Sequence, residues 1–174
     1  MDKSKRTYED IRRTLQAPFM DMELKVVDTL TNEGDVKKLV YVRNVNSKIK
    51  RIIDAFNGLV DFHFDNKIKP LGESLSSDKR SKTMYFLVES SVTIICYSAD
   101  ENGYPHTAAR EVSASSASVV HGTAYRNADG VFGNINLAEQ IASVQSMAVA
   151  NASKYLEVGL YLYFDNDENK DDKE

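Results

Sequence analysis

Residues 39–64, LVYVRNVNSKIKRIIDAFNGLVDFHF, join an alternating apolar run to a basic amphipathic segment. The first run predicts a strand over 38–43. Asn44 is typical of a helix N-cap, and apolar side chains recur after it at helical spacing. We therefore expect a helix with one buried face, made of Val45, Ile49, Ile52, Ile53 and Phe56. Asn57-Gly58 should end it, because both residues tolerate positive φ.

Upstream of this stretch the sequence predicts a short helix and a strand. Residues 7–17 place Ile11 and Leu15 on one helical face, and residues 22–31 alternate as a strand does. The segment NEGD then predicts a turn, so that 22–31 and 38–43 form a β-hairpin.

Downstream, the sequence predicts three strands separated by loops. The first is expected at 59–64, followed by a polar loop over 66–82. The β-branched and aromatic run 83–98 predicts a second strand, and 106–120 predicts its return partner beyond a turn at 100–103.

The last predicted element is a helix from about Leu137 to Glu157, capped by Asn136. No charged residue occurs between Gln140 and Ser153, although a solvent-facing helix normally carries charge opposite its apolar stripe. We expect one side to pack on the sheet and the other to meet another subunit or a ligand groove. The expected buried face comprises Leu137, Ile141, Val144, Ala148, Ala152 and Tyr155.

The predicted fold class is α+β: an antiparallel β-sheet (hairpin plus three-stranded meander) packed with a basic helix and a long C-terminal helix. The length of 174 residues suits one domain over 1–164, followed by a disordered acidic tail over 165–174. The sequence offers neither a long apolar span nor an apolar secretion signal, and Cys96 is its single cysteine. These features predict a cytoplasmic protein, in the bacterial host cytoplasm if phage-encoded, without membrane association.

The formal net charge of −4 conceals an uneven distribution. The ten-residue tail holds six acids and two lysines, which leaves 20 basic and 20 acidic residues in 1–164. Six basic residues and no acid fall between Lys37 and Ile53. A local positive field of this kind attracts a polyanion whatever the total charge is. A solvated surface that happens to be basic remains the alternative interpretation.

Reactive groups do not converge in the sequence. His63, His106 and His121 lie far apart, and Cys96 sits in an apolar strand as a core cysteine does. No glycine-rich phosphate loop is present. The sequence therefore predicts no enzyme activity, no catalytic residue, no metal site and no cofactor.

The basic helix supplies the candidate DNA ligands. Lys48 and Arg51 share one flank of the apolar face and are the preferred phosphate ligands. Lys50 lies on the opposite side, where Asp54 at i,i+4 can pair with it. Arg43 precedes the helix, and Lys67 in the expected polar loop completes the set of DNA-binding candidates found in this half of the chain.

The stretch at 39–64 resembles the early part of the single-strand annealing superfamily that joins the phage Erf proteins to the eukaryotic Rad fifty-two type. The stretch at 143–172, SVQSMAVANASKYLEVGLYLYFDNDENKDD, is similar to the Erf pattern of a small-residue helix, a basic-basic-Tyr triplet, an apolar run and an acidic cluster. Lys154-Tyr155 matches the last two members of the triplet, whereas Ser153 departs from it. The resemblance implies Lys154 as a DNA ligand and assembly into a ring or filament.

The function expected on these grounds is ATP-independent binding of single-stranded DNA and annealing of complementary strands in phage homologous recombination. The expected partners are single-stranded DNA and further copies of the chain, with a single-strand-binding protein or an exonuclease as further candidates. Two alternatives stay open. One is a structural or oligomerisation protein without DNA binding, and the other is a small α+β enzyme that uses Cys96 or a histidine.

Overall fold

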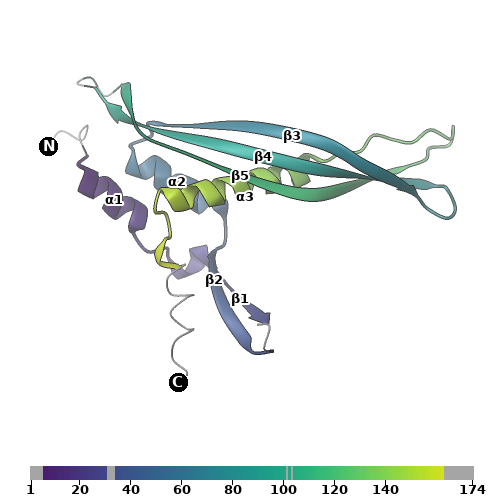
Figure 1. Cartoon of the computed structure of the whole chain (residues 1–174), viewed down its shortest axis with the longest axis horizontal. Helices are drawn as coiled ribbons and strands as arrows, with labels where there is room; N and C mark the ends of the chain where they lie inside the picture. The colour runs from purple at the N-terminus through teal and green to yellow at the C-terminus, as the bar shows by residue number, and fades with distance from the viewer. Residues whose placement is uncertain (1–5, 31–33, 101, 103, 163–174) are drawn as a thin grey trace. The chain divides into compact units, whose positions relative to one another are not determined.

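The computed structural model describes residues 6–30, 34–100, 102 and 104–162. Along the chain it contains helix α1 (Tyr8–Gln16), a 3-10 turn η1 (Asp21–Glu23), strands β1 (Leu24–Leu30) and β2 (Val36–Val42), helix α2 (Val45–Ala55), strands β3 (Val60–Leu75), β4 (Ser81–Ala99) and β5 (Pro105–Tyr125), and helix α3 (Ala138–Tyr155) (Figure 1). Of the predicted turns, 32–35 and 100–103 fall partly outside the described residues, and the acidic tail falls wholly outside them.

The strands form two antiparallel sheets. β1 pairs with β2 in a two-stranded ribbon whose register runs from Leu24 opposite Val42 to Leu30 opposite Val36. The second sheet has the order β3-β4-β5, so that strands adjacent in sequence are adjacent in space. The predicted α+β fold with a hairpin and a three-stranded meander is confirmed.

The chain separates into two compact units. Unit 1 comprises Met1–Asp61, Ile94–Val112 and Ala152–Glu174, and unit 2 comprises Phe62–Thr93 and Ser113–Asn151. Unit 1 therefore contains α1, the β1–β2 ribbon, α2 and the C-terminal end of α3. Unit 2 contains most of the three-stranded sheet and the rest of α3.

The helix boundaries in unit 1 follow local signals in the sequence. Thr7 and Asp10 cap α1 reciprocally, since the Thr7 hydroxyl accepts from the Asp10 N–H at 3.2 Å and the Asp10 carboxylate accepts from the Thr7 N–H at 3.3 Å. The Asn44 side chain caps α2 by accepting from the Asn46 N–H at 2.9 Å. Asn57 and Gly58 adopt φ of 53° and 86° just past the end of α2, as predicted.

The buried stripe of α2 differs from the predicted one. Lys48, Ile52, Ala55 and Phe56 are buried, whereas Ile53 is 38% exposed. The buried positions are spaced four, three and one apart and follow one side of the helix. Ile53 lies at the margin of that arc, so that including it in the buried face was wrong.

The core of unit 1 also draws on the end of α3. Leu156 and Val158 are wholly buried, and Leu162 is nearly so. Helix α3 stops at Tyr155 rather than near Glu157, and Glu157 adopts a positive φ of 66°. The turn buries the residues that follow Tyr155 and leaves Tyr155 itself 62% exposed. The prediction that Tyr155 belongs to the buried face was therefore wrong.

Unit 2 is organised around α3 and the inner side of its strands. Val88, Val120 and Val144 form the buried cluster, with Phe86, Leu137 and Ile141 packed against it. Gly122 in β5 is required there, because a Cβ at this position would lie 2.1 Å from the Ile135 Cγ2. The Asn136 side chain accepts from the Ala138 N–H at 2.9 Å and starts α3 as predicted.

Strand β3 is longer than expected. The sequence predicts a strand over 59–64 and a loop over 66–82, but β3 continues to Leu75 and β4 begins at Ser81. Residues 65–75 are exposed and include Pro70 and Gly72, which hide the alternation that marks a strand. An edge strand tolerates such residues, because one of its sides makes no ladder hydrogen bonds. Lys67 therefore lies in a strand and not in a loop.

Within the described part of the chain, no helix combines the length and the apolar character needed to cross a membrane.

Candidate nucleic-acid interface

The six predicted DNA ligands divide between the two units. Lys67 belongs to unit 2, and the other five belong to unit 1. The members in unit 1 are Arg43, Lys48, Lys50, Arg51 and Lys154. Their surroundings differ sharply, so they are described one by one.

Lys48 is a buried lysine on the core side of α2. Its residue is 7% exposed, although lysine is almost never buried without a partner. Among the described residues it has no hydrogen-bond or ion-pair partner. Among the described residues, Ser90 Oγ is the only fully buried side-chain oxygen or nitrogen that has no hydrogen-bond partner. The Lys48 Nζ, which also has no such partner, is therefore not fully buried and keeps some access to solvent. The aliphatic stem is thus buried while the charged end reaches a surface.

Lys154 lies near this ammonium. It occupies the last turn of α3, in the part of that helix that belongs to unit 1. Burial, which is the larger cause, and the positive charge of Lys154 together lower the pKa of Lys48 to about 8. The fold therefore brings together two predicted ligands that come from opposite halves of the sequence.

Lys48 and Lys154 carry like charges that lie close enough to interact, and Lys48 is partly desolvated. Each charge raises the free energy of the other, and burial adds to that cost. A phosphate placed near them would oppose the lowering of the Lys48 pKa, since an opposite charge within about 4–6 Å favours the protonated amine. The arrangement suits a phosphate group held by charge, without any requirement for base identity.

Arg51 serves the fold of unit 1 instead. Its guanidinium donates to the Ala17 carbonyl and, at 3.3 Å, to the Pro18 carbonyl, and lies 3.9 Å from the centre of the Phe19 ring. The side chain is 15% exposed and lies 3.9 Å from the Glu23 carboxylate. These contacts attach α2 to the segment after α1. They occupy the guanidinium, so we rank Arg51 below Lys48 as a phosphate ligand.

Lys50 and Arg43 lie at the surface. Lys50 pairs with Asp54 across one helical turn, as predicted. Arg43 is exposed at the junction of β2 and α2, where its backbone N–H donates to the Glu23 carbonyl at 2.6 Å. Both cations are available to a polyanion, but a surface ion pair such as that of Lys50 is weak and screened by salt.

Glu157, close to Lys154 in the sequence, contacts side chains of other elements that the sequence did not predict as its partners. Glu157 accepts from Arg12 at 3.1 Å and from Gln16 at 2.5 Å, and lies 3.9 Å from Arg110. Arg110 also donates to the Tyr155 carbonyl. No local motif marks these contacts, because they join α1, β5 and the end of α3. They fix the turn after α3 and with it the position of Lys154.

Lys67 lines a shallow hollow of about 170 Å3 in unit 2. The other lining residues are Asp65, Glu89, Ser90, Ser91 and Ser115. Two carboxylates against one ammonium give this hollow no positive excess. Lys67 therefore remains a predicted ligand with weaker support than Lys48 and Lys154.

Cys96, which the enzyme alternative would use, is a free and buried cysteine. Cys96 is wholly buried, and burial raises the pKa of its thiol to about 12, with Arg110 opposing the shift. A thiol of this kind is almost entirely protonated near neutral pH and a poor nucleophile. The described residues contain no group of three His, Cys, Asp or Glu side chains able to hold a metal ion.

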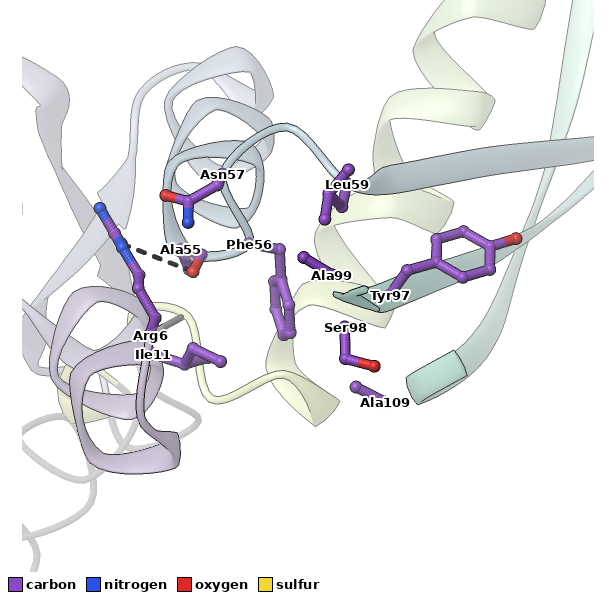
Figure 2. A pocket seen from close by; sticks show the side chains of 10 residues that line it. All are labelled: Arg6, Ile11, Ala55, Phe56, Asn57, Leu59, Tyr97, Ser98, Ala99 and Ala109. Carbon is purple, nitrogen blue, oxygen red and sulfur yellow. Dashed lines mark hydrogen bonds between the residues drawn. The ribbon is translucent and has the colours of Figure 1, made fainter. Parts of the chain in front are cut away.

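A larger hollow of about 280 Å3 lies in unit 1 (Figure 2). Its floor is apolar, and Arg6 at one side donates to the Ala55 carbonyl at 3.5 Å. The lining residues are Arg6, Ile11, Ala55, Phe56, Asn57, Leu59, Tyr97, Ser98, Ala99 and Ala109. Ser98 in this set donates to the Thr107 carbonyl and has no histidine or carboxylate beside it among the lining residues.

No protein-family model and no curated protein matches this chain.

Proposed function

We propose that the chain binds single-stranded DNA through its phosphates and promotes annealing of complementary strands without a nucleotide cofactor. The proposal is supported by the burial of Lys48 in unit 1 and by the nearby positive charge of Lys154, which together lower the pKa of the Lys48 ammonium. The basic surface residues Arg43 and Lys50 would extend the contact along the strand.

The proposed mechanism breaks and forms no covalent bond. Neutralising phosphates reduces the repulsion between two strands, and holding one strand extended exposes its bases for pairing. Base stacking and pairing then supply the free energy. The resemblance to the Erf and Rad fifty-two type supports the same function and adds assembly into a ring or filament.

The direct test mixes the purified chain, without nucleotide, with two labelled complementary oligonucleotides and follows duplex formation by fluorescence quenching. We expect the wild-type protein to accelerate annealing at low ionic strength. The double variant Lys48→Met, Lys154→Met should lose at least about 100-fold in affinity for the single strand, because charge-assisted contacts contribute roughly 1.5–3 kcal/mol each. Methionine keeps the length of the stem, so the fold should persist.

Lys50→Met, Asp54→Asn is the matched control. It removes a charge pair from the exposed flank of the same helix and should reduce affinity less than about threefold. Because the control leaves the net charge unchanged, equal losses in both double variants would show that binding does not depend on the Lys48–Lys154 site.

The salt dependence gives an independent measure. The logarithm of affinity should fall with the logarithm of salt concentration with a slope of about −0.7 for each phosphate neutralised. The Lys48→Met, Lys154→Met variant should show a shallower slope. A flat response of the wild-type protein, together with no acceleration of annealing, would favour the structural alternative.

A further inference from the structure

One face of the β1–β2 ribbon is mainly apolar and is exposed over the part that lies nearer the hairpin turn. By the register of the ribbon and the alternation of side chains, this face carries eight residues, which we call the ribbon face: Leu24, Val26, Asp28, Leu30, Val36, Lys38, Val40 and Val42. Val26, Leu30 and Val36 are 58%, 73% and 64% exposed. Six of the eight side chains are aliphatic, so the face is an exposed apolar surface and not a scatter of single residues.

The ribbon makes little contact outside itself. The two strands pair with each other along their length and otherwise touch mainly η1 and α2. Within unit 1, the ribbon extends away from α1 and α2 (Figure 1). A two-stranded ribbon is only marginally stable in water unless something packs against it. An exposed apolar face of this kind is a candidate surface for a partner.

The charges on the ribbon face indicate which occupant it takes. Asp28 and Lys38 are register partners, both are exposed, and they are the only charged residues on the face. The aliphatic pairs lie on both sides of them: Leu24 with Val42, Val26 with Val40, and Leu30 with Val36. We propose that this face packs against the same face of a second copy of the chain.

A two-fold axis along the strands makes the face complementary to itself. Rotation about such an axis lays β1 of one copy over β2 of the other at the same height, because register partners exchange places. Asp28 then faces Lys38 of the second copy, and the reverse pair forms on the other strand. Each aliphatic row meets an aliphatic row, which is the pattern of an isologous interface.

Charge reversal tests the pairing on the full chain without DNA, by sedimentation velocity. Asp28→Lys and Lys38→Asp each place two like charges on the face, and each variant alone should associate at least tenfold more weakly than the wild type. An equimolar mixture of the two variants should restore association, since one copy then carries two lysines and the other two aspartates. The double variant Asp28→Lys, Lys38→Asp should associate as the wild type does.

Lys25→Asp is the matched control. Lys25 is exposed on the opposite face of the same ribbon, so its reversal should leave association unchanged. Circular dichroism of every variant checks that the ribbon is intact. A monomeric wild type, single variants that associate normally, or a mixture that stays dissociated would each overturn the pairing and favour another protein as the occupant. The Lys48→Met, Lys154→Met variant should keep wild-type association, so loss of DNA binding and loss of pairing are separable.

Discussion

Helix α2 and the β1–β2 ribbon are both amphipathic elements of unit 1, and their sequences predict an apolar side equally well. In α2 that side is covered so completely that Ile52 and Ala55 are inaccessible and the stem of Lys48 is buried with them. In the ribbon, Val26 and Leu30 remain more than half exposed. Periodicity therefore identifies which side of an element is apolar, whereas covering that side depends on segments distant in sequence.

Among the variants that test this contrast, Ile52→Ala should cause the largest loss of stability. Ile52 is wholly buried, and truncation leaves a cavity in the core of unit 1. The free energy of unfolding should fall by about 2–5 kcal/mol, measured by urea denaturation. Ile53→Ala, next to it and 38% exposed, is the control and should cost under about 1 kcal/mol. Similar costs at both positions would contradict the observed stripe.

Arg51→Ala should cause the second-largest loss of stability. It removes the donors to the Ala17 and Pro18 carbonyls and the contact with the Phe19 ring. The free energy of unfolding should fall by about 2–3 kcal/mol. Arg43→Ala at the surface should change it by under about 0.5 kcal/mol. An unchanged stability of the Arg51 variant would return this residue to the phosphate ligands.

Lys48→Met should stabilise the free protein by on the order of 1–3 kcal/mol at pH 7, because a buried charge is replaced by an apolar side chain of similar length. The folded pKa of Lys48, about 8, lies below the ordinary value of 10.5. The destabilisation by the buried Lys48 charge is therefore complete below pH 8 and disappears as pH rises from about 8 to 10.5. In that range the unfolded chain binds more protons than the folded one, so the free energy of unfolding rises with pH.

Denaturation at pH 7 and pH 9.5 checks this sign. The difference between Lys48→Met and the wild type should shrink at the higher pH, and a constant difference would show that the charge is not its cause. A bound phosphate should raise the pKa of Lys48, so DNA binding near pH 8.5 should take up protons. Calorimetry in buffers of different ionisation enthalpy measures that uptake.

Val26→Ala should have the smallest effect on the dissociated chain. Val26 is 58% exposed, so truncation should lower the free energy of unfolding by under about 1 kcal/mol at concentrations where the protein is a monomer. At concentrations where copies associate, the same variant should associate more weakly. A large loss of stability in the monomer would mean that the chain itself covers the ribbon face.

The sequence predicted the element order and most helix boundaries, because capping residues and turn residues act locally. Thr7, Asn44 and Asn136 begin their helices as local hydrogen bonding requires. The predictions were wrong where no local pattern in the sequence marked the outcome. Strand β3 extends through exposed polar residues with no alternation, and Tyr155 is exposed because the chain turns just after it.

The candidate site was predicted as a set of residue types and not as an arrangement. Lys48, Lys50 and Arg51 are equivalent in a sequence that shows only their spacing. The structure separates them, since Lys48 has a buried stem and an ammonium near Lys154, Lys50 forms a surface ion pair, and Arg51 attaches α2 to the segment after α1. Arg110 and Glu157 could not be predicted, since their contact joins β5 to the end of α3.

The sequence by itself determined the α+β order of elements, the caps of α2 and α3, the presence of the hairpin and the basic character of α2, because these depend on neighbours within a few residues. Only the tertiary structure decided which lysine is buried, that Lys48 lies near Lys154, and that part of the ribbon face stays exposed. Those outcomes depend on solvent exclusion and on charges brought close by folding, and neither is a property of any single stretch of sequence.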